Sequence, residues 1–219
     1  LSEIPEGCQN ISQWIATSVQ ESLRRLRQKS LYGLLLHRPY QLLSKNGDDL
    51  FQELQKLKSS GKVNKIGISI YDPAELEGIC NRYEIDIVQA PLNIVDHRIV
   101  ESGWLSRLSE RGVELHVRSV FLQGLLLMSA SERPQKFNKW TSLWSNWDKW
   151  LKENNLTPLQ ACLRYVLSFS EIKRIIVGVD SLQQLDDIIS VSKNPLPDVP
   201  KNIFCSDVDL VNPTRWASL

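Results

Sequence analysis

The chain has 219 residues, of which 42% are hydrophobic and 23% charged, and its formal net charge is +1. This composition is typical of a globular protein, and the length suits one large domain or two small ones. The near-zero charge argues against a nucleic-acid partner, because such faces usually show clustered Lys and Arg. One basic run, at 22–30, reads as the solvated side of an amphipathic helix that also carries Leu23, Leu26 and Leu31.

The cysteines are scattered, without a CxxC pair or metal-ligand spacing: Cys8, Cys80, Cys162 and Cys205. This pattern predicts reduced structural thiols, a cytoplasmic location and no metal site. No run approaches the ~18 apolar residues of a membrane span, so we expect no membrane partner. The chain opens on Leu1 and a polar segment that does not resemble a signal peptide, so we expect the natural start to lie upstream.

Apolar runs alternate with helical patterns along the chain. The runs that predict strands are 32–37, 65–71, 86–93, 113–121 and 172–179. The patterns that predict helices are 48–62, 72–83, 101–112, 157–168 and 181–190. Asp72 with Pro73 and Thr157 with Pro158 are typical helix starts. Uninterrupted apolar strands with helical crossovers predict an α/β fold with a parallel sheet covered by helices.

A long segment, 129–156, carries four tryptophans at helical spacing: Trp140, Trp144, Trp147 and Trp150. A substrate-facing aromatic wall is one interpretation, and helix packing against the sheet is the one we favour. The tail from Pro195 to Leu219 contains prolines, and we expect it to pack over the outside.

Polar residues stand where the predicted strands end. They are His37, Ser69, Gln89 with Asn93, Arg118 with Ser119, and Gly178. Each of these residues could instead have a purely structural role. His37 could be a buried histidine whose ring nitrogens are hydrogen-bonded within the core, and Ser69 and Gln89 could bond to neighbouring backbone groups. The absence of GxGxxG after a strand argues against a dinucleotide-binding Rossmann domain. In a barrel, functional residues sit where strands end and their loops begin.

Five segments together resemble the aldo/keto reductase family, in order and at fitting distances from about Trp14 to Leu185. "SLRRLRQKSLYGLLLHRP" is similar to the family's SLxRL helix and fourth strand, which closes on His. "GKVNKIGISIYDPAEL" and "DIVQAPLNIVDHR" resemble the GKxxxIGxSN and xxQxxYNLLxR segments. "RGVELHVRSVFLQGLL" resembles GIxVxAxSPLxxGxL, and "IIVGVDSLQQLDD" the closing strand with its cofactor helix. The form of the fourth segment is similar to that of bacterial members.

The resemblance implies a (β/α)8 TIM barrel that reduces an aldehyde or ketone, a small-molecule carbonyl substrate, with NAD(P)H. His37 matches the histidine that polarises the carbonyl oxygen, and Pro39 ends its strand so that the imidazole faces the mouth. Ser69 and Gln89 match residues that hold the nicotinamide carboxamide, although Ile70 replaces the usual Asn. Arg118 occupies the position where many members stack a tyrosine on the nicotinamide.

The same resemblance assigns residues to the rest of the cofactor. Ser119, Phe121 and Gln123 fall in the loop that wraps the pyrophosphate, and Asp187 at the acidic position that meets the adenine. Gly178 and Gln184 stand where many NADP-using relatives place Lys and Arg around the 2′-phosphate. Losing two cations there weakens discrimination for NADP, so the sequence slightly favours NAD. A sugar or a sugar-derived aldehyde is the substrate that we expect on family grounds alone.

The resemblance also predicts that the front of the barrel is missing. Residues 1–219 match a single domain with the last five βα units and a tail, and the family's catalytic aspartate, tyrosine and lysine belong to the first three strands. Five strands cannot close such a barrel. The alternative to a reductase is therefore a non-catalytic partial barrel that serves as a binding or scaffold protein.

Overall fold

A computed structural model describes residues 1–191 and 194–219 and gives two compact units. Unit 1 comprises residues 1–90 and 107–115, and unit 2 comprises residues 91–106 and 116–219. The strands follow one another in a sheet of order β1-β2-β3-β4-β5, and the first three pair in parallel. They are β1 (Leu31–Leu36), β2 (Val63–Ser69), β3 (Ile87–Pro91), β4 (Glu114–Arg118) and β5 (Ile172–Ile175). The predicted α/β class is confirmed; a single domain over 1–219 stays a prediction.

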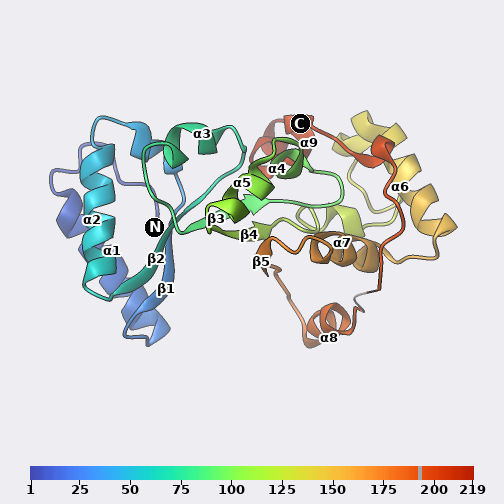
Figure 1. Ribbon diagram of the computed structural model, residues 1–219. Coiled ribbons are helices and arrows are strands. Elements are labelled where there is room, and N and C mark those ends of the chain that lie inside the picture. The colour runs from blue at the N-terminus through green and yellow to red at the C-terminus, as the bar shows by residue number, and fades with distance from the viewer. Residues whose placement is uncertain (192–193) are drawn as a thin grey trace. The chain divides into compact units, whose positions relative to one another are not determined.

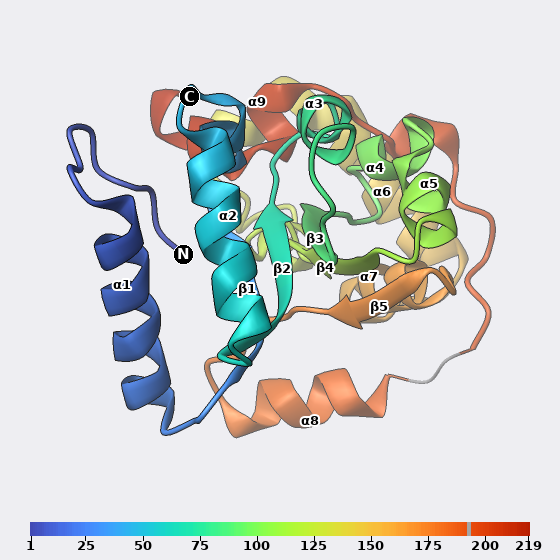
Figure 2. The same cartoon turned by 60° about the vertical axis from the view of Figure 1, so that its left-hand side comes forward.

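Unit 1 contains α1 (Ile11–Leu26), α2 (Gly47–Ser59) and α3 (Glu75–Cys80). Figure 2 shows α1 and α2 side by side, with α2 next to β2. Acidic residues in the first turn of α2 and lysines in its last turn complement the helix dipole. The apolar face of α2 is buried, and Gly61 follows the helix with a φ of 72°. This helix agrees with its prediction to within three residues.

Two predictions in unit 1 are corrected. The basic run 22–30 is not one helix: α1 ends at Leu26, Arg27 caps it in the left-handed region, and Leu31 begins β1. The helix expected at 72–83 is shorter, Glu75–Cys80; Asp72 Oδ1 accepts the Ala74 N–H at 2.9 Å, and the carboxylate of Glu75 accepts the backbone N–H groups of Tyr71 and Asp72. These bonds make residues 71–74 a turn that precedes the helix.

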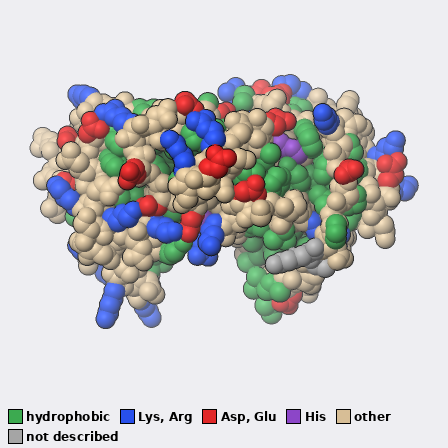
Figure 3. Space-filling model, viewed as in Figure 1, with side chains coloured by type: hydrophobic (Ala, Val, Ile, Leu, Met, Phe, Trp, Pro, Cys, Tyr) green, Lys and Arg blue, Asp and Glu red, His purple; other side chains and the backbone are tan. Residues whose placement is uncertain are grey.

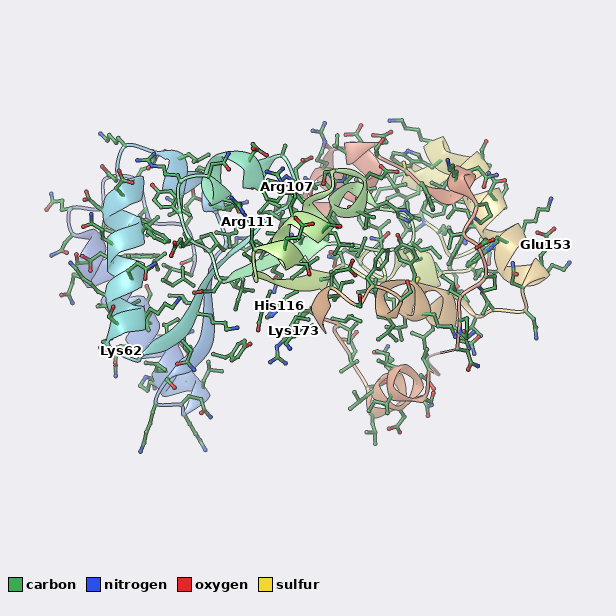
Figure 4. The ribbon with its side chains drawn as sticks, in the orientation of Figure 1. Lys62, Arg107, Arg111, His116, Glu153 and Lys173 are labelled. Atoms are coloured by element: carbon green, nitrogen blue, oxygen red, sulfur yellow. The ribbon has the colours of Figure 1, made fainter. Side chains whose placement is uncertain are left out.

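Arg107 and Arg111, labelled in Figure 4, connect to α3 within unit 1. The Nη1 of Arg107 donates to the Glu77 carboxylate at 2.9 Å, and the Nη1 of Arg111 donates to the Cys80 carbonyl oxygen at 3.3 Å. Arg107 belongs to α5 (Trp104–Glu110). The helix predicted at 101–112 is in fact two, because α4 (Arg98–Glu101) ends before Gly103, whose φ is 74°.

Unit 2 also contains α6 (Thr141–Glu153), α7 (Pro158–Leu167), α8 (Leu182–Ser190) and α9 (Val208–Val211). Helix α7 begins with a capping box, in which the Thr157 hydroxyl accepts the Gln160 N–H and the Gln160 side chain accepts the Thr157 N–H. Strand β5 ends at Ile175, four residues before its predicted end. The chain beyond β5 keeps one bond to β4, from Ile176 N–H to the Val117 carbonyl at 2.8 Å.

The tryptophans of segment 129–156 are packing residues, as we favoured. All four are less than 9% exposed. The indole N–H of Trp144 donates to the Phe137 carbonyl at 2.9 Å, and that of Trp150 to the Asp198 carbonyl at 3.0 Å. Figure 1 shows the C-terminal tail passing beside α6, which agrees with the expected position of the tail on the outside.

Helix α8 differs from the other long helices because none of its residues is buried. Leu182 is 73% exposed and Ile189 is 72% exposed. Figure 3 shows hydrophobic side chains gathered in the region of this helix. Within the described residues, none of the helices combines the length and the apolar character needed to span a membrane.

The packing of unit 1 predicts that Gly67→Ala destabilises the protein. A Cβ at Gly67 would lie 2.5 Å from the Ile87 carbonyl oxygen and 2.5 Å from Leu35 Cδ2, so β3 would have to shift. We expect a loss of about 2 kcal/mol in the free energy of unfolding, measured with urea. Gly178→Ala is the control, because its Cβ meets nothing within 4 Å. Equal stabilities of the two variants would contradict this account.

The buried His97 predicts a loss of stability in acid. Its ring stacks on Tyr165 with centroids 4.8 Å apart, and burial lowers the pKa of the imidazole, outweighing the favourable bond to the Ile94 carbonyl. The unfolded chain therefore binds a proton more readily, so the free energy of unfolding falls as pH drops below about 6.5, by up to about 1.4 kcal/mol per pH unit. The loss levels off below the folded-state pKa. Urea unfolding of the wild type and of His97→Gln from pH 7.5 to 5 measures this effect. The free energy of unfolding should fall less in the variant than in the wild type, and an equal fall in both would refute this role of His97.

Candidate active site

His37 follows the last residue of β1, where Leu36 pairs with Ile68 of β2. Pro39 then begins a 3-10 turn, so the strand cannot continue. The side chain of His37 is exposed, and its ring meets Tyr71 edge to face, with centroids 6.5 Å apart and planes at 84°. Among the described residues, no side chain or carbonyl forms a hydrogen bond or ion pair with the imidazole. The interpretation of His37 as a satisfied core histidine is therefore wrong.

Ser69 and Gln89 lie opposite each other where β2 and β3 pair. Ser69 is buried and Gln89 is half-buried, and the Ser69 hydroxyl donates to Gln89 Oε1 at 3.4 Å. The backbone carbonyl of Gln89 also accepts the Ile70 N–H at 2.9 Å. The structure thus brings these two predicted residues together. Such contacts are also expected if Ser69 and Gln89 only bond to neighbouring groups of the protein and bind no cofactor.

Asn93, which we noted with Gln89 at a strand end, has a structural role in unit 2. It is fully buried, and its Oδ1 accepts the N–H groups of Val95 and Asp96, both at 2.9 Å. Its Nδ2 donates to the Ser119 carbonyl at 3.0 Å. The side chain therefore fixes the start of the loop that follows β4.

That loop forms one wall of a cavity of about 600 Å³ in unit 2. The second wall is the start of α7, and the third is the segment after β5 with α8. Six of the nine residues predicted to bind cofactor line the cavity: Ser119, Phe121, Gln123, Gly178, Gln184 and Asp187. Residues from three separate parts of the sequence thus meet at one concave site.

The loop after β4 has an unusual backbone. Ser119, Leu122 and Gln123 have φ of 58°, 46° and 54°, and Gly124 has a φ of 85°. Such left-handed conformations turn successive N–H groups toward one side, which favours an anion. Within the described part of the chain, the N–H groups of Phe121 and Gln123 donate no hydrogen bond. Both residues line the cavity, so these donors can serve a bound phosphate.

The wall at α8 is held by side-chain bonds to backbone. The Ser181 hydroxyl caps the helix by accepting the Gln184 N–H at 3.2 Å. The Oε1 of Gln184 accepts the Asp180 N–H at 2.7 Å, which ties the segment after β5 to the helix. The Nε2 of Gln183 donates to Asp187 at 2.9 Å. Gln184 thus holds the segment after β5 against α8 and also lines the cavity.

Arg118 is not among the described lining residues of the cavity; its Nη1 donates to the Ser119 hydroxyl at 3.2 Å. Sequence reasoning missed Asp180 and Thr157 as lining residues. The position of Asp180, two residues after Gly178, was a signal for the first. The capped start of α7 was recognised, but nothing in its sequence connects it with the cavity.

Three of the cysteines are poor candidates for an activated nucleophile. Burial raises the pKa of the Cys162 thiol strongly, and burial also raises the pKa of Cys80 and Cys205. All four cysteines are free. Thiols with raised pKa values stay protonated at neutral pH, which agrees with the structural role expected of them.

The fold and the cavity define an α/β protein with a concave surface at the segments that follow β4 and β5. The profile of the aldo/keto reductase family matches residues 5–200. The chain therefore belongs to the aldo/keto reductase family, which consists of oxidoreductases acting on small-molecule carbonyl compounds. A comparison with curated protein sequences found no match.

Solved structures share the fold. An apo aldo-keto reductase, AKR11C1 from Bacillus halodurans, superposes with a TM-score of 0.67 at 21% identity, covering 89% of this chain and 67% of that one. A thermostable aldo-keto reductase, Tm1743, solved with the inhibitor epalrestat, gives 0.62 at 18% identity, covering 86% and 63%. The glycerol dehydrogenase AKR11B4 from Gluconobacter oxydans gives 0.57 at 19% identity, covering 89% and 71%.

These comparisons correct one expectation. The family profile matches residues 5–200 of the chain, and the expectation that a front part of the domain is missing is not borne out. The roles expected of His37, Ser69, Gln89 and Arg118 stay predictions.

Proposed function

We propose that the protein binds a nicotinamide dinucleotide in the cavity of unit 2 and reduces an aldehyde or ketone to an alcohol. The observation that carries this proposal is the cavity itself, which gathers six residues that the family resemblance assigns to the cofactor. Its volume of about 600 Å³ lies in the range of small-molecule sites.

The residues present fit such a cofactor. The backbone N–H groups of Phe121 and Gln123 offer donors for the pyrophosphate, and Phe121 adds an apolar surface. When bound, the nicotinamide supplies the hydride. The family resemblance assigns the carboxamide of this ring to Ser69 and Gln89, and such contacts fix which ring face meets the substrate.

His37 is the catalytic residue that we assign on this chain. A neutral imidazole donates an N–H to the substrate oxygen, and the donation strengthens as negative charge develops there. The exposed position of His37 after β1 leaves the ring available for this bond. A non-catalytic binding protein, which holds the dinucleotide without turnover, is the alternative.

The cavity supports a preference for NAD over NADP. The two positions where many relatives carry cations are Gly178 and Gln184, and Asp180 and Asp187 add carboxylates to the lining. Among the described lining residues there is neither Lys nor Arg. A 2′-phosphate would therefore meet negative charge without compensation. A sugar-derived aldehyde as substrate and a cytoplasmic location remain proposals from the family and from the free cysteines.

Gly178→Lys tests both the cavity and this preference. Open space surrounds the position of a Cβ at Gly178, so the longer side chain fits and brings a cation to the predicted 2′-phosphate site. We expect the ratio of NADPH to NADH affinity to rise about fivefold, measured by fluorescence titration of the full chain. Gly178→Ala adds volume without charge and should leave the ratio as it is. Absence of nucleotide binding by the wild type would refute the proposed function.

His37→Ala tests the chemical step. Because the imidazole stabilises charge that develops during the reaction, we expect kcat to fall about a hundredfold while the Kd for NADH changes less than twofold. Steady-state kinetics on a panel of aldehydes, with the same titration for the Kd, measures both. If turnover is unchanged, His37 has been assigned wrongly. If wild type binds NADH but turns over none of the panel, the binding-protein alternative is favoured.

A further inference from the structure

The imidazole of His37 has one partner that can set its orientation. No hydrogen bond holds the ring within the described residues, whereas Tyr71 meets it edge to face at 6.5 Å and 84°. The two residues follow neighbouring strands of unit 1, β1 and β2. Perpendicular aromatic pairs at such centroid distances are attractive, because the positive edge of one ring meets the negative face of the other.

Tyr71 is itself held in place by the backbone around it. The N–H groups of Tyr71 and Asp72 both donate to Glu75 Oε1 at 2.8 Å. The preceding N–H, that of Ile70, donates to the Gln89 carbonyl at 2.9 Å. Three consecutive N–H groups are therefore bonded, two to α3 and one to β3. The main chain that carries the Tyr71 ring is thus fixed relative to the end of β2, and the ring is half-buried.

We propose that Tyr71 is a positioning residue that sets the orientation of the His37 imidazole. This inference rests on the proposed function, in which His37 donates an N–H to the substrate oxygen. An exposed imidazole without hydrogen bonds samples several rotamers, and only those that aim the N–H at the oxygen stabilise the transition state. The Tyr71 ring narrows this set before substrate binds. The ring and not the hydroxyl carries the effect.

Kinetics of Tyr71 variants tests the proposal. Tyr71→Leu keeps an apolar side chain but removes the ring, and we expect kcat to fall about fivefold while the Kd for NADH changes less than twofold. Tyr71→Phe keeps the ring and should restore the kcat lost in Tyr71→Leu. In a His37→Ala background, Tyr71→Leu should cause no further loss, because the residue acts through the imidazole. Tyr40→Leu is the matched control, since Tyr40 is exposed and bonds to Glu3.

Nuclear magnetic resonance of the His37 ring gives a readout that does not depend on turnover. Removing the Tyr71 ring should change the chemical shifts of the imidazole protons in Tyr71→Leu but not in Tyr71→Phe. Identical imidazole shifts in the wild type and both variants would overturn the proposal, as would full kcat in Tyr71→Leu. If His37→Ala keeps full turnover, the proposed function fails instead. The spectra still test whether the Tyr71 ring packs against the imidazole.

Discussion

The cavity of unit 2 depends on the buried amide of Asn93. This side chain has no exposure to solvent, and it joins the segment after β3 to the start of the loop after β4: its Oδ1 accepts the N–H groups of Val95 and Asp96, and its Nδ2 donates to the Ser119 carbonyl. Buried amides are costly unless each polar atom is paired, and here both the oxygen and the nitrogen are. Ser119 then begins a loop with several left-handed residues. Without a fixed origin, such a loop could adopt many other conformations.

Most of the fold could be predicted from periodicity and capping. The apolar spacing of Leu50, Leu54 and Leu57 and the Thr157–Pro158 start placed α2 and α7 closely, since both signals are local. The beginning of α3 was not predictable in this way, because Glu75 could serve equally as a first-turn residue and as an acceptor for Tyr71 and Asp72. The end of β5 was missed because apolar residues continue beyond the last strand bonds.

The residues of the candidate site also fall into two groups, those that local sequence patterns predict and those that depend on packing. Positions at strand ends, such as His37 and Ser69, follow from strand order and were accessible to sequence reasoning. The contribution of Thr157 to the cavity depends on where α7 packs, and no local pattern carries that information. The bond from Asp180 to Gln184 depends on backbone geometry after β5. Gln184 was therefore interpreted only by what it lacks, a positive charge, although its oxygen ties two segments together.

The exposure of α8 has a thermodynamic consequence for the cavity that it lines. A helix of nine residues gains little from its own hydrogen bonds, and α8 buries no side chain that would compensate for the entropy of ordering it. Opening of this helix should therefore require less free energy than unfolding of α7, whose core face is buried. A ligand that contacts Gln184 and Asp187 would bind only the molecules in which α8 is folded. Its observed binding free energy would therefore be smaller than its intrinsic binding free energy by the free energy needed to order the helix. Amide hydrogens of α8 would then exchange more slowly in the complex than in the free protein, while those of α7 would change little.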